Sequence, residues 1–294
     1  MLNHTKDTRR LAGRLVKMIA AATIVLGAVS VHAGIKDTTH NLGAATRGQN
    51  YMTAGDGATE ICVFCHTPHA SNTAVKAPLW NKPVAAGSTY TTYTTATSAT
   101  IDGSVDMSGI SLACLSCHDG TQAMDTMINK PGSGGFTSGG ATITNRAWTG
   151  ATQSAGLMTN AGDRISMLGQ DLTNDHPVGI QYCGGGLSTG SSSTTNAGST
   201  TGCRDADFNT PQTGTIGGHT AWWVDSAGGT AGARGKTDMI LYARAPTLAG
   251  DSTSGWYQPF VECASCHDPH TSVNPTFLRI SNAQSAVCLT CHNK

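Results

Sequence analysis

Four copies of the pentapeptide C-x-x-C-H constrain the folding of this chain more than any other feature. Together they contain eight of its ten cysteines. In every copy a histidine directly follows the second cysteine. The copies are CVFCH (Cys62, Cys65, His66), CLSCH (Cys114, Cys117, His118), CASCH (Cys263, Cys266, His267) and CLTCH (Cys288, Cys291, His292).

This spacing is typical of c-type haem attachment, in which two thiols bond to the porphyrin edge and the histidine is the proximal iron ligand. Two other uses of paired cysteines compete. Zinc sites usually place their histidines several residues away from the cysteine pair. Redox disulfides do not require a histidine after each pair. Four complete copies therefore predict four covalently bound haem c groups.

Large hydrophobic residues are too scarce for a conventional core. Val, Leu, Ile and Phe make up 47 of the 294 residues, whereas glycine alone makes up 36. A content below about 20% accompanies disorder when the net charge is high, but here 18 basic residues balance 18 acidic ones. This composition disfavours an α/β enzyme or a helical bundle. Porphyrins would supply the missing apolar surface.

We expect a multihaem cytochrome c fold, mostly irregular coil with short helices and few strands, because no window shows sustained hydrophobic periodicity. The short helices should lie around the C-x-x-C-H segments, and a Thr-rich stretch favours a strand at 88–101. The expected helices are 60–66, 112–118, 261–267 and 286–292.

The N-terminal residues 1–33 have the pattern of a signal peptide. Five basic residues precede an apolar run at 18–31, and Val31-His32-Ala33 ends the segment. The run of 14 residues is shorter than the roughly 20 that a membrane anchor needs. We expect an exported protein with no membrane span after cleavage. The balanced charge gives no reason to expect binding to nucleic acid.

Three segments should follow the signal peptide. Residues 34–150 carry the first two haem motifs, 151–235 form a Gly/Ser/Thr-rich connection, and 236–294 carry the third and fourth motifs. The two remaining cysteines, Cys183 and Cys203, lie in the connection. Outside the cytoplasm they should form a disulfide, with free thiols as the alternative.

After removal of the predicted signal peptide, five histidines outside the motifs are available as second axial ligands: His40, His69, His176, His219 and His270. We expect His40, His69, His176 and His270 to be distal ligands and His219 to be structural. His69 and His270 each follow a proximal histidine by three residues, with a proline between. Such a histidine starts on the proximal side of its own haem, so it should ligate a neighbouring haem.

Enough histidines are present to fill every axial position, which favours electron transfer over catalysis. An enzyme such as a nitrite or sulfur-oxyanion reductase would need one five-coordinate haem. No C-x-x-C-K variant, which would mark such a haem, occurs in the chain. We therefore expect an electron-transfer protein without a catalytic residue.

The strings THNLG, EICVFCHTPH, PLWNKP, CLSCHDGT, DLTNDHPVGI, VECASCHDPH and CLTCHNK resemble the multihaem c-type cytochromes of metal-respiring bacteria. The chain is most similar to the tetrahaem outer-surface members that form filaments. The resemblance implies bis-histidine haems in a continuous stacked chain, little regular secondary structure, and polymerisation. It also implies that a histidine of one subunit ligates a haem of the next, and His40 has the matching N-terminal position.

The expected function is long-range electron transfer by haem-to-haem hopping, in the subunit of an extracellular conductive filament. The alternative is a monomeric periplasmic electron shuttle. Redox proteins or extracellular metal oxides would be the partners.

Overall fold

The computed structural model describes residues 34–43, 50–56, 59–94, 98, 100–132, 134–161, 165–185, 187, 203–244 and 258–293. Residues 34–294 belong to one compact unit. The predicted signal peptide lies outside the described residues. No helix in the ranges above is long and apolar enough to cross a membrane.

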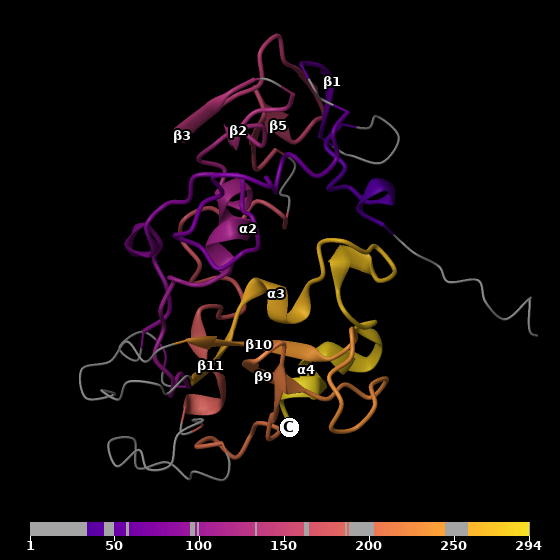
Figure 1. Cartoon of the computed structure of the whole chain (residues 1–294). Helices are drawn as coiled ribbons and strands as arrows, with labels where there is room; N and C mark the ends of the chain where they lie inside the picture. The colour runs from indigo at the N-terminus through magenta and orange to yellow at the C-terminus, as the bar shows by residue number, and fades with distance from the viewer. Residues whose placement is uncertain are drawn as a thin grey trace, which may run out of the picture. The chain divides into compact units, whose positions relative to one another are not determined.

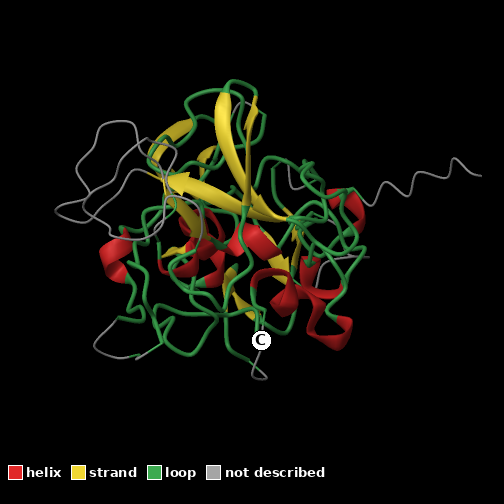
Figure 2. Ribbon diagram, turned by 90° about the horizontal axis from the view of Figure 1, so that it is seen from below, coloured by secondary structure: helices red, strands yellow, loops and turns green. Residues whose placement is uncertain are grey.

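Loops connect short helices and strands throughout this unit (Figure 2), which agrees with the expected irregular architecture. The α-helices are α2 (Ser111–His118), α3 (Cys263–Cys266) and α4 (Ala286–Cys291). Single 3-10 turns are η1 (Ile35–Asp37), η2 (Gly87–Thr89), η3 (Tyr182–Gly184), η4 (Pro275–Phe277) and η5 (Ala283–Ser285). The strands are β1 (Tyr51–Ala54), β2 (Met127–Asn129), β3 (Phe136–Ala141), β4 (Ala147–Thr149), β5 (Gln153–Ser154), β6 (Leu157–Met158), β7 (Ile180–Gln181), β8 (Gln212–Ile216), β9 (His219–Val224), β10 (Met239–Arg244) and β11 (Gln258–Val261).

Helices occur at three of the four C-x-x-C-H segments, as predicted. The first segment forms turns instead of a helix, although the His66 amide still donates to the Cys62 carbonyl at 2.8 Å. The described residues of 88–101 do not form the predicted strand: they include part of the 3-10 turn Gly87–Thr89 and an isolated bridge from Thr91 to Asp171. Residues 95–97 and 99 of this prediction lie outside the described residues.

A five-stranded antiparallel sheet was not predicted. Its order is β7-β11-β10-β9-β8, so it joins the 151–235 connection to the 236–294 segment. The hairpin between β8 and β9 turns at Gly217 and Gly218, whose φ angles of 58° and 81° suit glycine. Strand β10 lies at the centre, and α3 packs against it (Figure 1).

Three small hydrophobic clusters take the place of one large core. One surrounds Phe64 of the first motif, one packs under Leu112 and Leu115 of α2, and one joins Trp222 of the sheet to Val287 of α4. Each cluster thus lies against a C-x-x-C-H segment. Two-stranded sheets β1–β4, β2–β3 and β5–β6 complete the first half of the unit.

A buried ionic cluster connects the second and third motifs. Glu262, only 1% exposed, forms an ion pair with Arg244 and accepts a 2.5 Å hydrogen bond from the Ser111 hydroxyl at the start of α2. The Ser111 hydroxyl in turn accepts from the Cys263 amide at 3.0 Å. Arg244 also donates to the Asp106 carbonyl. The cluster therefore fixes the start of α2 against the start of α3.

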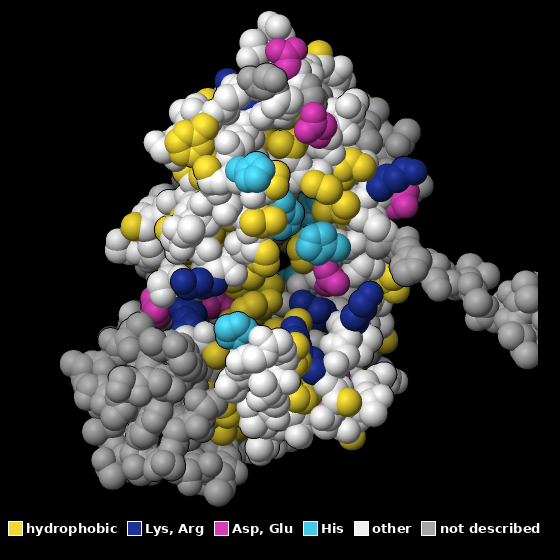
Figure 3. Space-filling model, viewed as in Figure 1, with side chains coloured by type: hydrophobic (Ala, Val, Ile, Leu, Met, Phe, Trp, Pro, Cys, Tyr) yellow, Lys and Arg dark blue, Asp and Glu magenta, His cyan; other side chains and the backbone are white. Residues whose placement is uncertain are grey.

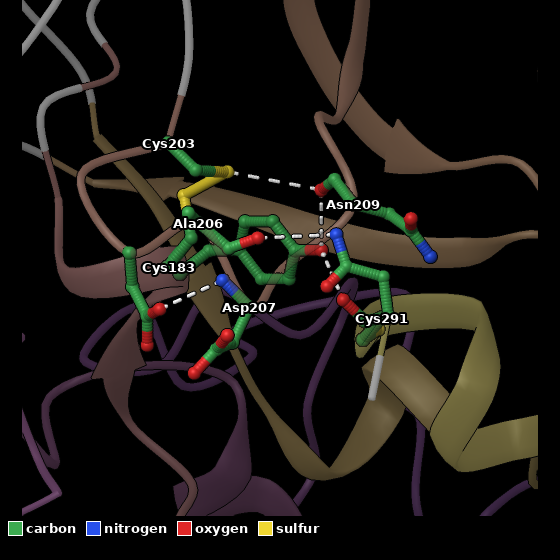
Figure 4. The surroundings of a disulfide bond; sticks show 9 residues. Cys183, Cys203, Ala206, Asp207, Asn209 and Cys291 are labelled. Atoms are coloured by element: carbon green, nitrogen blue, oxygen red, sulfur yellow. Dashed lines mark hydrogen bonds between the residues drawn. A yellow bond between two sulfur atoms is a disulfide. The ribbon is translucent and has the colours of Figure 1, made fainter.

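Cys183 and Cys203 form a disulfide whose Cα atoms are 5.3 Å apart (Figure 4). Cys183 lies in the cluster around Trp222 and is 1% exposed. The bond closes a connection of 20 residues and ties the segment that starts at Cys203 to the sheet.

Replacing Glu262 by glutamine should lower the free energy of unfolding by about 3 kcal/mol, because Arg244 would stay buried without its closest carboxylate. Chemical denaturation followed by circular dichroism measures this loss. Glu60→Gln, at an exposed position, is the matched control and should have little effect. Equal stability of the two variants would contradict a role for the buried cluster.

Replacing both Cys183 and Cys203 by serine should destabilise the protein by roughly 3 kcal/mol, because the unfolded chain regains the entropy of a loop of this length. Thermal unfolding under non-reducing conditions compares the variant with the wild type. Titration of the denatured, unreduced wild type should find neither thiol free. Two reactive thiols from this pair would refute the bond.

Candidate haem-attachment sites

A backbone carbonyl holds the ring of three of the four motif histidines. The Nδ1 atoms of His66, His118 and His267 lie 2.7, 2.6 and 2.7 Å from carbonyl oxygens. The acceptors are Pro78, Ser166 and Thr276, respectively. A donor bond at Nδ1 fixes the tautomer and leaves Nε2 as the nitrogen available to a metal.

A short segment pairs with the first motif as an antiparallel bridge, and we call this segment, residues 78–81, a brace. The backbone N–H of Asn81 donates to the Cys65 carbonyl, and the backbone N–H of Thr67 donates to the Leu79 carbonyl, both at 2.8 Å. His66 and Trp80 are therefore opposite each other. The brace holds the motif from the residue before the histidine to the residue after it.

The third and fourth motifs have braces with the same pattern. In the third, at 276–279, Arg279 donates to the Cys266 carbonyl at 2.9 Å. In the fourth, at 206–209, Asn209 donates to the Cys291 carbonyl at 2.8 Å. Bridges place His267 opposite Leu278 and His292 opposite Phe208. One local geometry thus recurs at three of the four motifs.

The last residue of each brace also caps carbonyls inside its motif. The side-chain amide of Asn81 donates to the Val63 carbonyl at 2.7 Å. The side-chain amide of Asn209 donates to the carbonyls of Leu289 and Thr290 at 3.1 and 3.0 Å. The Arg279 guanidinium donates to Ala264 and Ser265. Such short turns leave carbonyls unpaired, and the brace satisfies them.

The disulfide anchors the fourth brace. Tyr182, next to Cys183, donates its hydroxyl to the Asn209 carbonyl at 2.8 Å and to that of Cys291 at 3.2 Å (Figure 4). The Ala206 carbonyl corresponds in position to those of Pro78 and Thr276. It accepts the Asn293 side-chain amide at 3.1 Å.

Two of the free histidines face motif histidines from distant segments. The rings of His66 and His270 have centroids 6.1 Å apart, and those of His118 and His40 are 6.2 Å apart. Two metal–imidazole bonds of about 2 Å, with each ring centre a further ~1 Å from its nitrogen, separate two axial imidazoles by roughly 6 Å. Both pairs therefore have the spacing of bis-histidine ligation.

The outer nitrogens of both free histidines face protein acceptors. His270 Nδ1 lies 3.4 Å from an Asp268 carboxylate oxygen, and His40 Nδ1 lies 3.3 Å from the Pro269 carbonyl. Burial, together with the nearby His118, lowers the pKa of His40 to about 4. His40 is thus held as a neutral imidazole beside His118 of its own chain. The predicted role of His40 across a subunit boundary stays a prediction.

The other predicted distal histidines are less closely paired. Burial lowers the pKa of His176, and the nearby charge of His292 adds to this effect. His69 is exposed, and its imidazole has no hydrogen-bond partner among the described residues. His219, expected to be structural, is exposed at the start of β9. Neither imidazole makes a ring contact with a motif histidine in the part of the chain described.

The thiols of successive motifs lie near one another. The Cys114 thiol donates a hydrogen bond to Cys263, which raises the pKa of Cys114 and lowers that of Cys263 to about 7. Burial raises the pKa of Cys65 to about 12, and Cys117 contributes. Burial likewise raises the pKa of Cys291 to about 12, with a contribution from Cys266. The attachment points therefore follow one another in sequence order.

The surroundings of the motifs fit a large apolar group with polar edges. Exposed hydrophobic side chains lie in or near all four sites: Leu79, Ile165, Val273 and Leu289 are 52%, 83%, 66% and 49% exposed. The Trp80 indole N–H is buried without an acceptor among the described residues. The centroids of the Trp80 and His66 rings are 6.0 Å apart. Histidine and hydrophobic side chains gather around a hollow on one face (Figure 3). Haem c, with apolar faces and carboxylate edges, suits these residues.

The motif cysteines and histidines were predicted from the sequence, but the braces were not. Each brace contributes mainly backbone groups, which leave little trace in residue type. The one signal is a hydrophobic residue in each brace next to a side chain that can donate hydrogen bonds, as in Trp80-Asn81 and Phe208-Asn209.

Comparison with protein families supports this interpretation for the last part of the chain. Residues 258–294 match the family model described as a doubled CXXCH motif, which covers the third and fourth sites. No curated protein matches the chain. The doubled motif points to covalent haem binding of the c-type cytochrome kind at these two sites.

Proposed function

We propose that the chain is an exported tetrahaem c-type cytochrome that performs long-range electron transfer by haem-to-haem hopping, as the subunit of an extracellular filament. The observation that carries the proposal is the spacing of two imidazole pairs, His66–His270 and His118–His40, at 6.1 and 6.2 Å. Two axial histidines leave an iron no open position, which suits electron transfer rather than binding of a substrate.

When bound, haem c supplies a one-electron Fe(III)/Fe(II) couple. The chain's own residues hold and insulate that couple. The cysteines would fix each group covalently, the carbonyls of Pro78, Ser166 and Thr276 orient three of the proximal imidazoles, and Asp268 and Pro269 orient two distal ones. Because these partners are fixed before any electron arrives, little rearrangement should accompany a change of charge.

The proximity of thiols in successive motifs supports close spacing of four groups in sequence order. Cys114 of the second motif contacts Cys263 of the third, and Cys65 and Cys266 interact with cysteines of their neighbours. The buried Glu262–Arg244 pair holds the second and third motifs together. We propose a continuous, stacked order from the first haem to the fourth.

We assign His270 to the first site and His40 to the second on the spacing of their rings, and His176 to the fourth on its electrostatic interaction with His292. In this assignment the third site has no imidazole from the described residues. His69 is exposed and equivalent in its motif to His270. We propose that His69 reaches the third site of a neighbouring subunit and so links subunits into a filament.

A monomeric periplasmic shuttle is the second candidate, because a soluble electron carrier could use the same within-chain pairs. Redox proteins would be its partners, whereas extracellular metal oxides are also accessible to a filament. Cell fractionation separates the two, since only a filament accumulates outside the outer surface.

Replacing His270 by alanine should convert one of four low-spin haems to a high-spin form, because the first iron would lose its second imidazole. Optical and EPR spectra of the fully loaded protein, assembled into filaments, measure the change. His219→Ala is the matched control and should leave four low-spin haems. A high-spin signal already present in the wild type would contradict the bis-histidine proposal.

Protein from the cell surface should form filaments in negative-stain images, and His69→Ala should abolish them while all four haems remain attached. Intact mass counts the haems in both proteins. Dispersed wild-type particles under several conditions would favour the shuttle. Filaments formed by His69→Ala would refute the role of His69.

A further inference from the structure

The three braces end on equivalent positions that differ in charge. Asn81, Asn209 and Arg279 each donate a backbone amide to the second cysteine of a motif and cap the motif carbonyls with the side chain. The first and fourth sites thus have a neutral amide at this position. The third site has a guanidinium, which is always charged.

The Arg279 side chain lies within the third site. Its Nε and Nη2 atoms donate to the carbonyls of Ala264 and Ser265, the two residues between the motif cysteines, at 3.0 to 3.3 Å. Its Nη1 donates to the Lys236 carbonyl at 3.2 Å. The guanidinium is therefore fixed against the turn that carries the two attachment cysteines.

No carboxylate neutralises this charge, since no ion pair of Arg279 occurs among the described side chains. The field of Arg279 reaches a neighbouring group. Burial raises the pKa of Tyr242, and Arg279 opposes that rise with its charge and a hydrogen bond.

We propose that Arg279 is a positioning residue that raises the reduction potential of the haem at the third site above the value that a neutral brace would give. This inference rests on the proposed haem attachment. Reduction of ferric iron adds one negative charge to the site, and a fixed cation nearby stabilises that charge. The brace thus orients the site and sets its potential with one side chain.

The test uses full-length, exported, haem-loaded protein carrying Arg279→Gln, which keeps an amide donor but removes the charge. A spectroelectrochemical titration is fitted with four one-electron components. One component should move to lower potential, with its reduction equilibrium weakened by about tenfold, or ~59 mV for a one-electron couple. The other three should stay in place.

Two further variants separate charge from structure. Arg279→Lys keeps the charge and should retain most of the wild-type potential. Lys130→Gln removes a cation near β2 and should move no component. If Arg279→Gln fails to mature, Arg279→Asn reproduces the residue of the other two braces and gives the same measurement.

Four unchanged reduction potentials in Arg279→Gln would overturn the inference. An equal fall of the potential in Arg279→Lys would also overturn it. Intact mass distinguishes these outcomes from a failure of the proposed function. Four attached haems with unmoved potentials refute only the role of Arg279. Fewer than four in the wild type refute the tetrahaem proposal itself.

Discussion

The bond between an imidazole Nδ1 and a fixed carbonyl is the interaction on which the sites depend. Without it, a histidine next to a covalently attached cysteine could rotate and present either nitrogen. Pro78, Ser166 and Thr276 remove that freedom at three sites. The backbone bridges that hold Pro78 and Thr276 also fix the spacing of the motif itself, so ligand orientation and local fold share one cause.

This dependence explains why the unit needs so little hydrophobic core. Backbone bridges, a buried ion pair and a disulfide hold segments that few apolar contacts could hold. The three hydrophobic clusters are small, and each lies under a motif. Exposed side chains such as Ile165 and Val273 show that part of the apolar surface faces outward where a prosthetic group would cover it.

The sequence predicted the attachment residues because covalent chemistry requires exact residue types at exact spacing. It predicted helices at 112–118 and 286–292 for the same reason, since the motif turn places both thiols on one side, and the structure has them at Ser111–His118 and Ala286–Cys291. The sheet was missed because a glycine-rich composition concealed the hairpin at Gly217-Gly218. The strand predicted at 88–101 is not formed by its described residues, because propensity alone supplies no partner strand. The braces pair with their motifs through backbone groups at variable sequence separations, so they leave no comparable pattern of residue types in the sequence.

The position of each brace along the chain has a consequence for assembly. The carbonyls that hold His66 and His267 follow them by 12 and 9 residues, whereas Asn209 precedes Thr290 of the fourth motif by 81 residues. When the chain is exported from its N-terminus, the first and third motifs therefore emerge before the carbonyls that hold their histidines. The fourth motif instead emerges to meet a support that the Cys183–Cys203 bond can already have fixed. Oxidative folding of the connection would thus prepare the final docking step before its ligand arrives.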